Sequence, residues 1–506
     1  MKQWICLCLA LLLCLPFAAS CGGKTPQGGE NTKTSGESGQ DSTPDSEPGT
    51  EVETDEYGRE VLKSALPEDL KYDNEKVTVM VRSSQELWFV GSDDKKASAI
   101  QQALYTRDRR VEDRLNVKLV IKPVTQTGSD TKDYDQTVQA ALNGAGEYDI
   151  ITSYAFYTPT LAIGGCFADM NGVKNLHMDT LCWNRDFADS VAFDGALYFN
   201  VGDFSLDYLG KLTTIYFNKA LATQYFDSSD VIYDMVNDGS WTLENVGALV
   251  KEIYTDVNSN NARDIDDFYG FTMNAASGPC ESMVSGVGFS YTEKDADGNY
   301  TVFKMDTTLS DKIDAIHRFL NLEGCAPRAI WNWGKGCNAF IAQKTIFLSS
   351  AMDVSNSFLD VDFAYGFLPP MKYDEHQTRY YTGIGDSFSL QALMRNGADN
   401  ERAGAVLQCL NETSYQLTTP EYFNVLLKGR YADEPNDVRM LELLRSTVLC
   451  DFGRIYSSRL SRITGGVWNN FCNPAANYSK WYEENSGTWA QNLKDLLEEL
   501  RKGKTA

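Results

Sequence analysis

The sequence has few of the residues and none of the motifs that mark the common enzyme classes. It contains three histidines, His177, His317 and His376, and each stands alone. No HExxH, GxSxG, Walker loop or GxGxxG segment occurs, so no motif indicates a metalloprotease, a serine hydrolase or a nucleotide site. A glycoside hydrolase stays open, because it needs only two carboxylates about 5–10 Å apart and the chain has 70 acidic residues.

Basic residues are also scarce relative to acidic ones. The 46 lysines and arginines leave a formal net charge of −24. This charge argues against nucleic acid as a partner and against electrostatic binding to anionic lipid. The composition, 42% hydrophobic and 12% aromatic, is that of a soluble globular protein rich in rings.

The longest apolar run is too short for a membrane-spanning helix. It extends from Trp4 to Ala19, whereas a bilayer requires about 20 apolar residues. Small residues follow it directly before Cys21, so residues 1–20 read as a secretory signal peptide. The segment resembles a bacterial lipoprotein processing site, with Ala18 in place of the usual Leu. The resemblance implies a fatty acyl chain such as palmitate on Cys21 and a protein held on the outer face of the cell membrane. The alternative is an ordinary cleaved signal.

The segment after the signal lacks core-forming residues. Gly22–Glu51 contains no aliphatic, aromatic or Met residue, so it cannot bury enough apolar surface to offset the entropy of ordering. We therefore expect a disordered linker over residues 21–71 and a folded body over residues 72–506.

The body contains eight of the chain's 12 cysteines. None lies in a CxxC or similar spacing, so a metal site made of cysteines is not indicated. An even number outside the cell allows disulfides, and free buried thiols are equally compatible with the sequence. The eight are Cys166, Cys182, Cys280, Cys325, Cys337, Cys409, Cys450 and Cys472.

The start of the body alternates strand and helix. β-Branched runs predict strands, and apolar residues at helical spacing, such as Ile100, Leu104, Val111 and Leu115, predict amphipathic helices. The predicted strands are Val77–Val81, Val117–Ile121 (ended by Pro123) and Tyr148–Thr152. This order predicts an α/β fold with a parallel sheet. Ligands bind beyond the carboxyl ends of such strands, where Trp88, Tyr154 and Tyr157 are expected to lie.

Further along, several segments occur in the order found in one protein family. They are Tyr148–Ile151 with Gly164–Met170, Phe193–Tyr198, Ile215–Lys219, Ser240–Asn245, Lys335–Phe347, Tyr365–Pro370 and Gly383–Ala392. Together they resemble the extracellular solute-binding proteins of family 1, the maltose-binding-protein-like receptors of bacterial ABC importers. The Pro that usually precedes the Trp241 segment is missing, and Cys337 and Asn338 depart from the family pattern.

The resemblance implies a two-lobed periplasmic-binding-protein-like fold of type II, with lobes joined by two or three crossing hinge strands. The first lobe would hold about residues 73–202 and 379–428, and the second about 203–378 and 429–506. The implied function is capture of a solute, an oligosaccharide above all, by a monomer that delivers it to an ABC permease without catalysis. A surface glycan-binding or sensor module without transport stays an alternative, as does a glycoside hydrolase.

A sugar site combines aromatic rings with carboxylates and amides, because the apolar faces of sugars stack on rings while their hydroxyls need polar partners. Asp203 lies at the first expected crossing, and Asp386 and Ser387 lie where a glycine-bounded strand begins. Trp468, after Gly465-Gly466, falls where related sugar binders carry a late stacking Trp. With Trp88, Tyr154 and Tyr157, these residues are the predicted ligand site, although each is also compatible with a packing role.

One loop resembles a calcium-binding loop. Oxygen-bearing side chains stand at loop positions 1, 3, 5, 9 and 12, and the Ala262 carbonyl is available at position 7. The expected ligands are Asp256, Asn258, Asn260, Ala262, Asp264 and Asp267. Asn261 replaces the usual turning Gly, and Asp267 replaces the usual Glu. The predicted role of calcium is structural, no catalytic cofactor is expected, and the alternative is a solvated loop of Asx turns.

Overall fold

The computed structural model describes residues 53–55, 58–125, 132–144, 146–274, 277–332, 334–358, 360–427 and 435–505. The signal peptide, Cys21 and the segment up to Glu51 lie outside the described residues, so the anchor and the linker stay predictions. Within the described residues, no helix is both long and apolar enough to cross a bilayer. Packing begins before the predicted start at residue 72, because Leu62 and Leu66 are buried in the same core cluster as β1 (Glu75–Arg82).

A four-stranded sheet, here the first sheet, forms from the segments predicted as strands. Its order is β11-β3-β1-β2, with β2 (Val117–Val124), β3 (Ile150–Tyr154) and β11 (Ser389–Leu393). β1 pairs in parallel with β2 and β3, as the alternation of strand and helix predicted, and β11 pairs antiparallel to β3. β2 continues past Pro123, which pairs with Val81. β2 is an edge strand, and an edge strand tolerates proline because on its open side there is no neighbouring strand to which a backbone N–H could donate.

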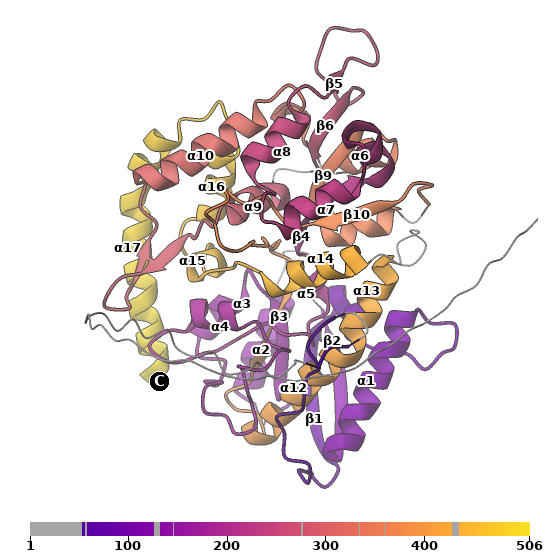
Figure 1. Cartoon of the computed structure of the whole chain (residues 1–506). Coiled ribbons are helices and arrows are strands. Elements are labelled where there is room, and N and C mark those ends of the chain that lie inside the picture. The colour runs from indigo at the N-terminus through magenta and orange to yellow at the C-terminus, as the bar shows by residue number, and fades with distance from the viewer. Residues whose placement is uncertain are drawn as a thin grey trace, which may run out of the picture. The chain divides into compact units, whose positions relative to one another are not determined.

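The two predicted crossover helices are present, and their ends have the expected chemistry. α1 (Ala99–Leu115) begins at Ser98, whose side chain accepts a hydrogen bond from the backbone N–H of Gln101, and it ends at Asn116 in the left-handed region. α1 packs beside α12 (Asn400–Thr413) along the first sheet (Figure 1). The other crossover helix is α2 (Lys132–Leu142).

A second sheet has five strands in the order β10-β4-β9-β6-β5. Its strands are β4 (Thr213–Asn218), β5 (Tyr254–Thr255), β6 (Phe268–Met273), β9 (Thr345–Ala351) and β10 (Tyr365–Leu368). A separate hairpin, β7 (Thr292–Lys294) and β8 (Tyr300–Val302), turns at Asp297-Gly298. We call the part of the chain built around β11, β3, β1 and β2 the first half. The part built around β10, β4, β9, β6 and β5 is the second half.

The remaining helices connect and cover the sheets. The α-helices are α3 (Thr158–Ile163), α4 (Arg185–Val191), α5 (Asp207–Gly210), α6 (Lys219–Phe226), α7 (Asp230–Asn237), α8 (Leu243–Val250), α9 (Gly278–Gly286), α10 (Thr307–Leu320), α11 (Lys335–Ile341), α13 (Thr419–Leu427), α14 (Pro435–Ser446), α15 (Phe452–Ile455), α16 (Ile463–Phe471) and α17 (Tyr478–Thr505). The 3-10 segments are η1 (Ser83–Trp88), η2 (Arg328–Ile330) and η3 (Met352–Phe358), and Ser414–Thr418 (η4) is a π-helix.

Three chain segments lie side by side where the two halves join. Leu212 bridges to Ile384, and Thr382 bridges to Val448. The backbone N–H of Thr213 donates to the carbonyl of Gly383 at 2.8 Å, and that of Thr382 donates to Thr447 at the same distance. The expected crossing segments are therefore confirmed, whereas the exact lobe boundaries stay predictions.

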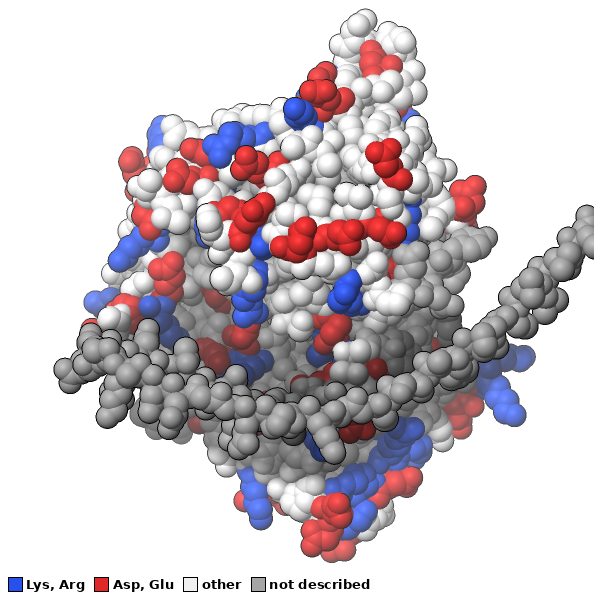
Figure 2. Space-filling model, viewed as in Figure 1, with Lys and Arg blue, Asp and Glu red and all other residues white. Residues whose placement is uncertain are grey.

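The charged side chains are spread over the surface. Figure 2 shows Asp and Glu side chains interspersed with Lys and Arg on the viewed face, with no large continuous basic patch among the described residues of that face.

Candidate binding site

Aromatic rings gather at the carboxyl ends of the first sheet, as the strand topology predicted. Tyr154 is the last residue of β3, and Tyr157 caps the start of α3; both are half-buried. Their ring centroids are 5.5 Å apart, and Phe156 lies 5.0 Å from Tyr157. Arg82, the last residue of β1, places its guanidinium 5.2 Å from the Tyr154 ring. The parallel strands β1 and β3 thus both end beside this group of aromatic rings, which we call the aromatic surface.

Arg82 is buried and holds this surface to the crossing segments. It bonds the carboxylate of Asp207 at 3.1 Å and the hydroxyl of Ser389 at 3.0 Å. It also donates to the backbone carbonyl of Ser387 at 3.1 Å. Burial raises the pKa of Asp207, and the Arg82 charge opposes that rise. The predicted residue Ser387 therefore joins this region through its backbone.

Arg454 is the centre of a second group, the Arg454 cluster, formed with Glu281, Asp386 and Trp468. Nη1 of its guanidinium pairs with the carboxylate of Asp386. Nε of the same guanidinium lies 3.3 Å from the carboxylate of Glu281. The Arg454 and Glu281 side chains are 4% and 2% exposed, whereas Asp386 is 30% exposed. Asp386 is thus the carboxylate that this cluster presents to solvent.

Trp468 is fixed by the same cluster. Its indole N–H donates to Oε2 of Glu281 at 2.6 Å, and the Arg454 guanidinium lies 5.6 Å from its ring. Glu281 also accepts a hydrogen bond from the Tyr291 hydroxyl at 2.9 Å. The half-buried ring is therefore oriented by a charged partner that is itself held in place.

The Arg454 cluster lies close to the aromatic surface of the first half. Burial raises the pKa of Tyr154 to about 12, and the negative charge of Asp386 adds to the rise. Tyr154 comes from the first sheet, Asp386 from a crossing segment, and Glu281 from α9, which packs on β9 of the second sheet. The predicted residues Tyr154, Asp386 and Trp468 are thus brought to one region from both halves.

Trp88 stands at the end of η1 beside another charged pair. Its ring packs edge-on against Tyr422, with centroids 5.6 Å apart. A Cβ placed on Gly210 would lie 3.7 Å from Trp88 and 3.3 Å from Asp353, so these residues converge at Gly210. Asp353, in η3 after β9, pairs with Lys211, and both side chains are about a quarter exposed, at 22% and 24%.

Asp203 takes a different place from the other predicted residues. It is buried, pairs with Arg445 at 3.2 Å and accepts from the Thr419 hydroxyl at 2.8 Å. Burial raises its pKa, and the Arg445 charge opposes the rise. Its carboxylate is therefore satisfied within the protein.

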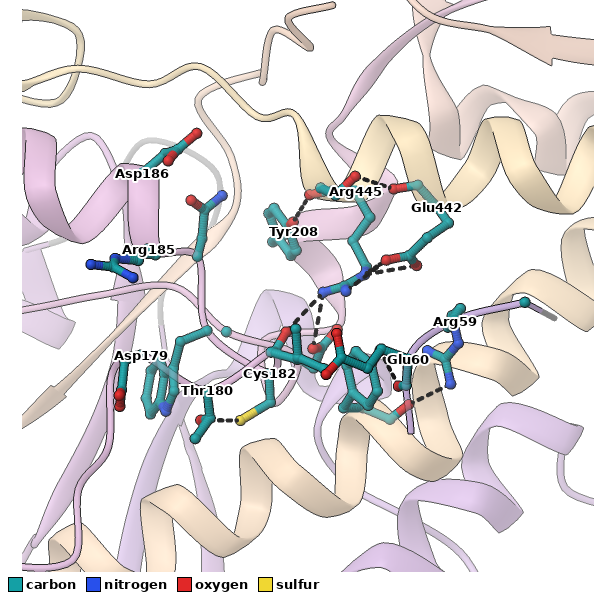
Figure 3. Close-up of a pocket in the computed structure, with 18 residues that line it drawn as sticks. Arg59, Glu60, Asp179, Thr180, Cys182, Arg185, Asp186, Tyr208, Glu442 and Arg445 are labelled. Atoms are coloured by element: carbon teal, nitrogen blue, oxygen red, sulfur yellow. Dashed lines mark hydrogen bonds and ion pairs between the residues drawn. The ribbon is translucent and has the colours of Figure 1, made fainter. Parts of the chain in front are cut away.

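Asp203 lines a pocket of about 440 Å³, the Arg445 pocket. Figure 3 shows Arg445 reaching from α14 toward the loop that carries Thr180 and Cys182, with Glu442 at its side. The Tyr415 ring lies between Arg59, at 4.5 Å, and Arg445, at 5.0 Å. Because Arg445 pairs with both Asp203 and Glu442, these charged groups of the pocket serve the contact between α14 and the first half.

The calcium-like loop is organised by its own hydrogen bonds. Asn261 has a φ of 57°, the left-handed conformation expected of the residue that replaces Gly. Asp256 accepts from the backbone N–H of Asn260 at 3.2 Å and of Asn261 at 2.8 Å, and Asp267 accepts from that of Asp264 at 3.1 Å. Among the described residues, no group of three or more His, Cys, Asp or Glu is arranged to hold a metal. Calcium in this loop stays a prediction.

The residues that sequence reasoning missed are the ones that orient the others. Arg82, Glu281 and Arg454 carry no motif, and each acquires its role through contacts between segments far apart in the chain. One signal in the sequence could have found Arg82. An Arg within a β-branched, buried strand needs a buried polar partner.

No model of a known protein family matches the sequence, and no curated protein matches it either. Among solved structures, the chain is similar to a cyclo/maltodextrin-binding protein complexed with maltotetraose, with a TM-score of 0.50 and 12% identity over 85% of this chain and 98% of that chain. It is also similar to the cyclic alpha-maltosyl-1,6-maltose binding protein from Arthrobacter globiformis, with a TM-score of 0.52 and 12% identity over 83% and 98%. The chain therefore has the periplasmic-binding-protein fold, in which crossing segments join two α/β halves, as these two sugar-binding proteins do.

Proposed function

We propose that this protein is a solute receptor that captures an oligosaccharide between its two halves and passes it to an ABC permease. The observation that carries the proposal is the group of half-buried rings, Tyr154, Tyr157 and Trp468, next to the partly exposed carboxylate of Asp386. Rings of this kind stack on the apolar faces of sugars, and carboxylates accept hydrogen bonds from hydroxyls.

The charges of the site favour a neutral ligand. Asp386 is paired with Arg454, Asp353 with Lys211, and Asp207 with Arg82. An ionised solute would face charged groups that already have partners within the protein, and it would lose its hydration without gaining a full partner. A sugar needs only hydrogen bonds and ring contacts, and the paired carboxylates supply acceptors for its hydroxyls.

Capture would proceed by hinge closure. Residues 211–213, 382–385 and 447–449 lie side by side at the junction, so small backbone changes there would move one half against the other. A ligand that touches Tyr154 in the first half and Trp468 in the second binds the closed state better and shifts the population toward it.

Attachment to the membrane completes the proposal. An acylated Cys21 followed by the linker up to Glu51 would hold the body at the outer face of the cell membrane, within reach of a permease. The length and composition of this segment support a flexible tether, since it contains no core-forming residues.

Calorimetric titration with maltotetraose and with cyclic malto-oligosaccharides, followed by chromatography of the recovered sugar, tests this function. The proposal predicts saturable binding and recovery of the sugar intact. Cleavage of the sugar would identify a glycoside hydrolase instead. Binding of amino acids or peptides but of no sugar would refute the assigned ligand class.

A further inference from the structure

Two buried cysteines are in contact beside the Arg454 cluster. Cys280 lies in α9 and Cys472 directly follows α16, and both side chains are 0% exposed. Sγ of Cys472 is 3.6 Å from the carbonyl oxygen of Cys280, and burial together with the neighbouring Cys280 thiol raises the pKa of Cys472. All eight body cysteines are described, buried and unbridged, and Cys280 and Cys472 are the pair joined by a contact from the sulfur of one to the backbone carbonyl of the other.

A guanidinium spans the same contact. Nη1 of Arg328 donates to the carbonyl of Cys472 at 2.9 Å and lies 3.6 Å from Sγ of Cys280. Nη2 of Arg328 donates to Asn469 in α16 at 2.9 Å. Arg328 thus holds α16 against α9 at the point where Cys280 and Cys472 come together.

We propose that Cys280 and Cys472 form a disulfide when the chain folds in the presence of a small-molecule disulfide oxidant such as oxidised glutathione. One cysteine thiolate attacks a sulfur of the oxidant, which gives a mixed disulfide and releases one thiol. The second cysteine then attacks the protein sulfur of the mixed disulfide and releases the other thiol. The protein loses two protons and two electrons, and the oxidant is reduced to two thiols.

The bond forms during folding, while both sulfur atoms are still accessible. In the folded state burial raises the pKa of the Cys472 thiol well above its usual range, which slows exchange. The two residues are 192 positions apart, so the bond closes a long loop and restricts the unfolded chain strongly.

The disulfide would also fix part of the proposed sugar site, and this consequence rests on the proposed function. Glu281 follows Cys280 directly, and Trp468 precedes Cys472 by one helical turn. A covalent bond between α9 and α16 would hold the Trp468 indole against Glu281, a contact of 2.6 Å. A ring held in its bound position loses less entropy when a ligand arrives, so the oxidised protein should bind sugar more tightly.

The test is a cysteine map of protein refolded with and without a glutathione redox buffer. After unfolding and alkylation, the oxidised wild type should carry two alkyl groups fewer than the reduced protein. Digestion should yield one linked pair of peptides, containing Cys280 and Cys472. Alkylation of all eight cysteines, or a link between any other two, would overturn the proposal.

Three variants test which cysteines form the link. Cys280→Ser and Cys472→Ser should each abolish the link and leave every remaining cysteine alkylated. Cys325→Ser is the matched control: Cys325 is 1% exposed, and its backbone contacts Phe271 and Arg263 rather than either cysteine of the pair, so the variant should keep the link. Loss of the link in Cys325→Ser as well, or its survival in Cys280→Ser, would contradict the assignment.

Melting and binding measurements test how the disulfide changes the stability of the protein and its affinity for sugar. Oxidised wild type should melt at least about 3 °C above reduced wild type, because the bond restricts the unfolded chain, and the two forms of Cys280→Ser should melt together. The cysteine map needs no ligand. A mapped link in a protein that binds no sugar would therefore refute the proposed function alone, and tight sugar binding with eight free thiols would refute the disulfide alone.

Discussion

Replacement of Trp468 by Ala removes the half-buried ring that Glu281 and Arg454 hold in place. The indole donates to Glu281 at 2.6 Å and lies 5.6 Å from the Arg454 guanidinium. Truncation of an aromatic anchor in a binding site costs at least about 1 kcal/mol and often about 2 kcal/mol. We therefore expect sugar affinity to fall about 5-fold to 30-fold, as measured by calorimetric titration.

The fold should survive this change. Glu281 keeps its ion pair with Arg454 and its hydrogen bonds from Tyr291 and Ser285, so no carboxylate is left buried without a partner. The matched control is Trp481→Ala, since Trp481 is also half-buried but packs on Trp489 in α17, with ring centroids 4.9 Å apart. Unchanged affinity in Trp468→Ala, or an equal loss in both variants when thermal melts show both folded, would show that the Trp468 ring makes no specific contact with the sugar.

Three further outcomes are expected. Asp451→Ala should lower the melting temperature by the equivalent of about 1–2 kcal/mol and weaken sugar binding, because Asp451 caps α15 through the N–H groups of Gly453 and Arg454; a stable variant with full affinity would contradict this. Cys21→Ala should move the protein from the membrane fraction to the medium, and a protein that stays membrane-bound would rule out the thiol anchor. Calcium should raise the melting temperature of wild type but not of Asp264→Ala, and equal curves with calcium and with chelator would show that the loop needs no metal.

The topology was largely predictable from the sequence, because strand and helix periodicities in the first half are local signals. The rule that ligands gather at the carboxyl ends of parallel strands led directly to Tyr154 and Tyr157, which the structure places together. Trp468 required the resemblance to a family, since a half-buried Trp in a short helix has no local signature.

The partners of these residues were not predictable. Arg454 in α15 and Glu281 in α9 meet as an ion pair between segments far apart in the chain, and no sequence periodicity encodes that contact. Asp203 was placed at a crossing segment, but its carboxylate bonds Arg445 and Thr419 rather than joining the rings. A residue's position along the chain does not decide which neighbour its side chain reaches.

A thermal-shift screen of the wild-type protein against monosaccharides, oligosaccharides, amino acids and short peptides tests directly whether the protein is a sugar receptor. A ligand that binds only the folded state stabilises it by about 2.7 kcal/mol at a hundredfold excess over its dissociation constant. We expect a neutral oligosaccharide to raise the melting temperature and to be recovered unchanged. A shift with amino acids or peptides and none with any sugar would contradict it.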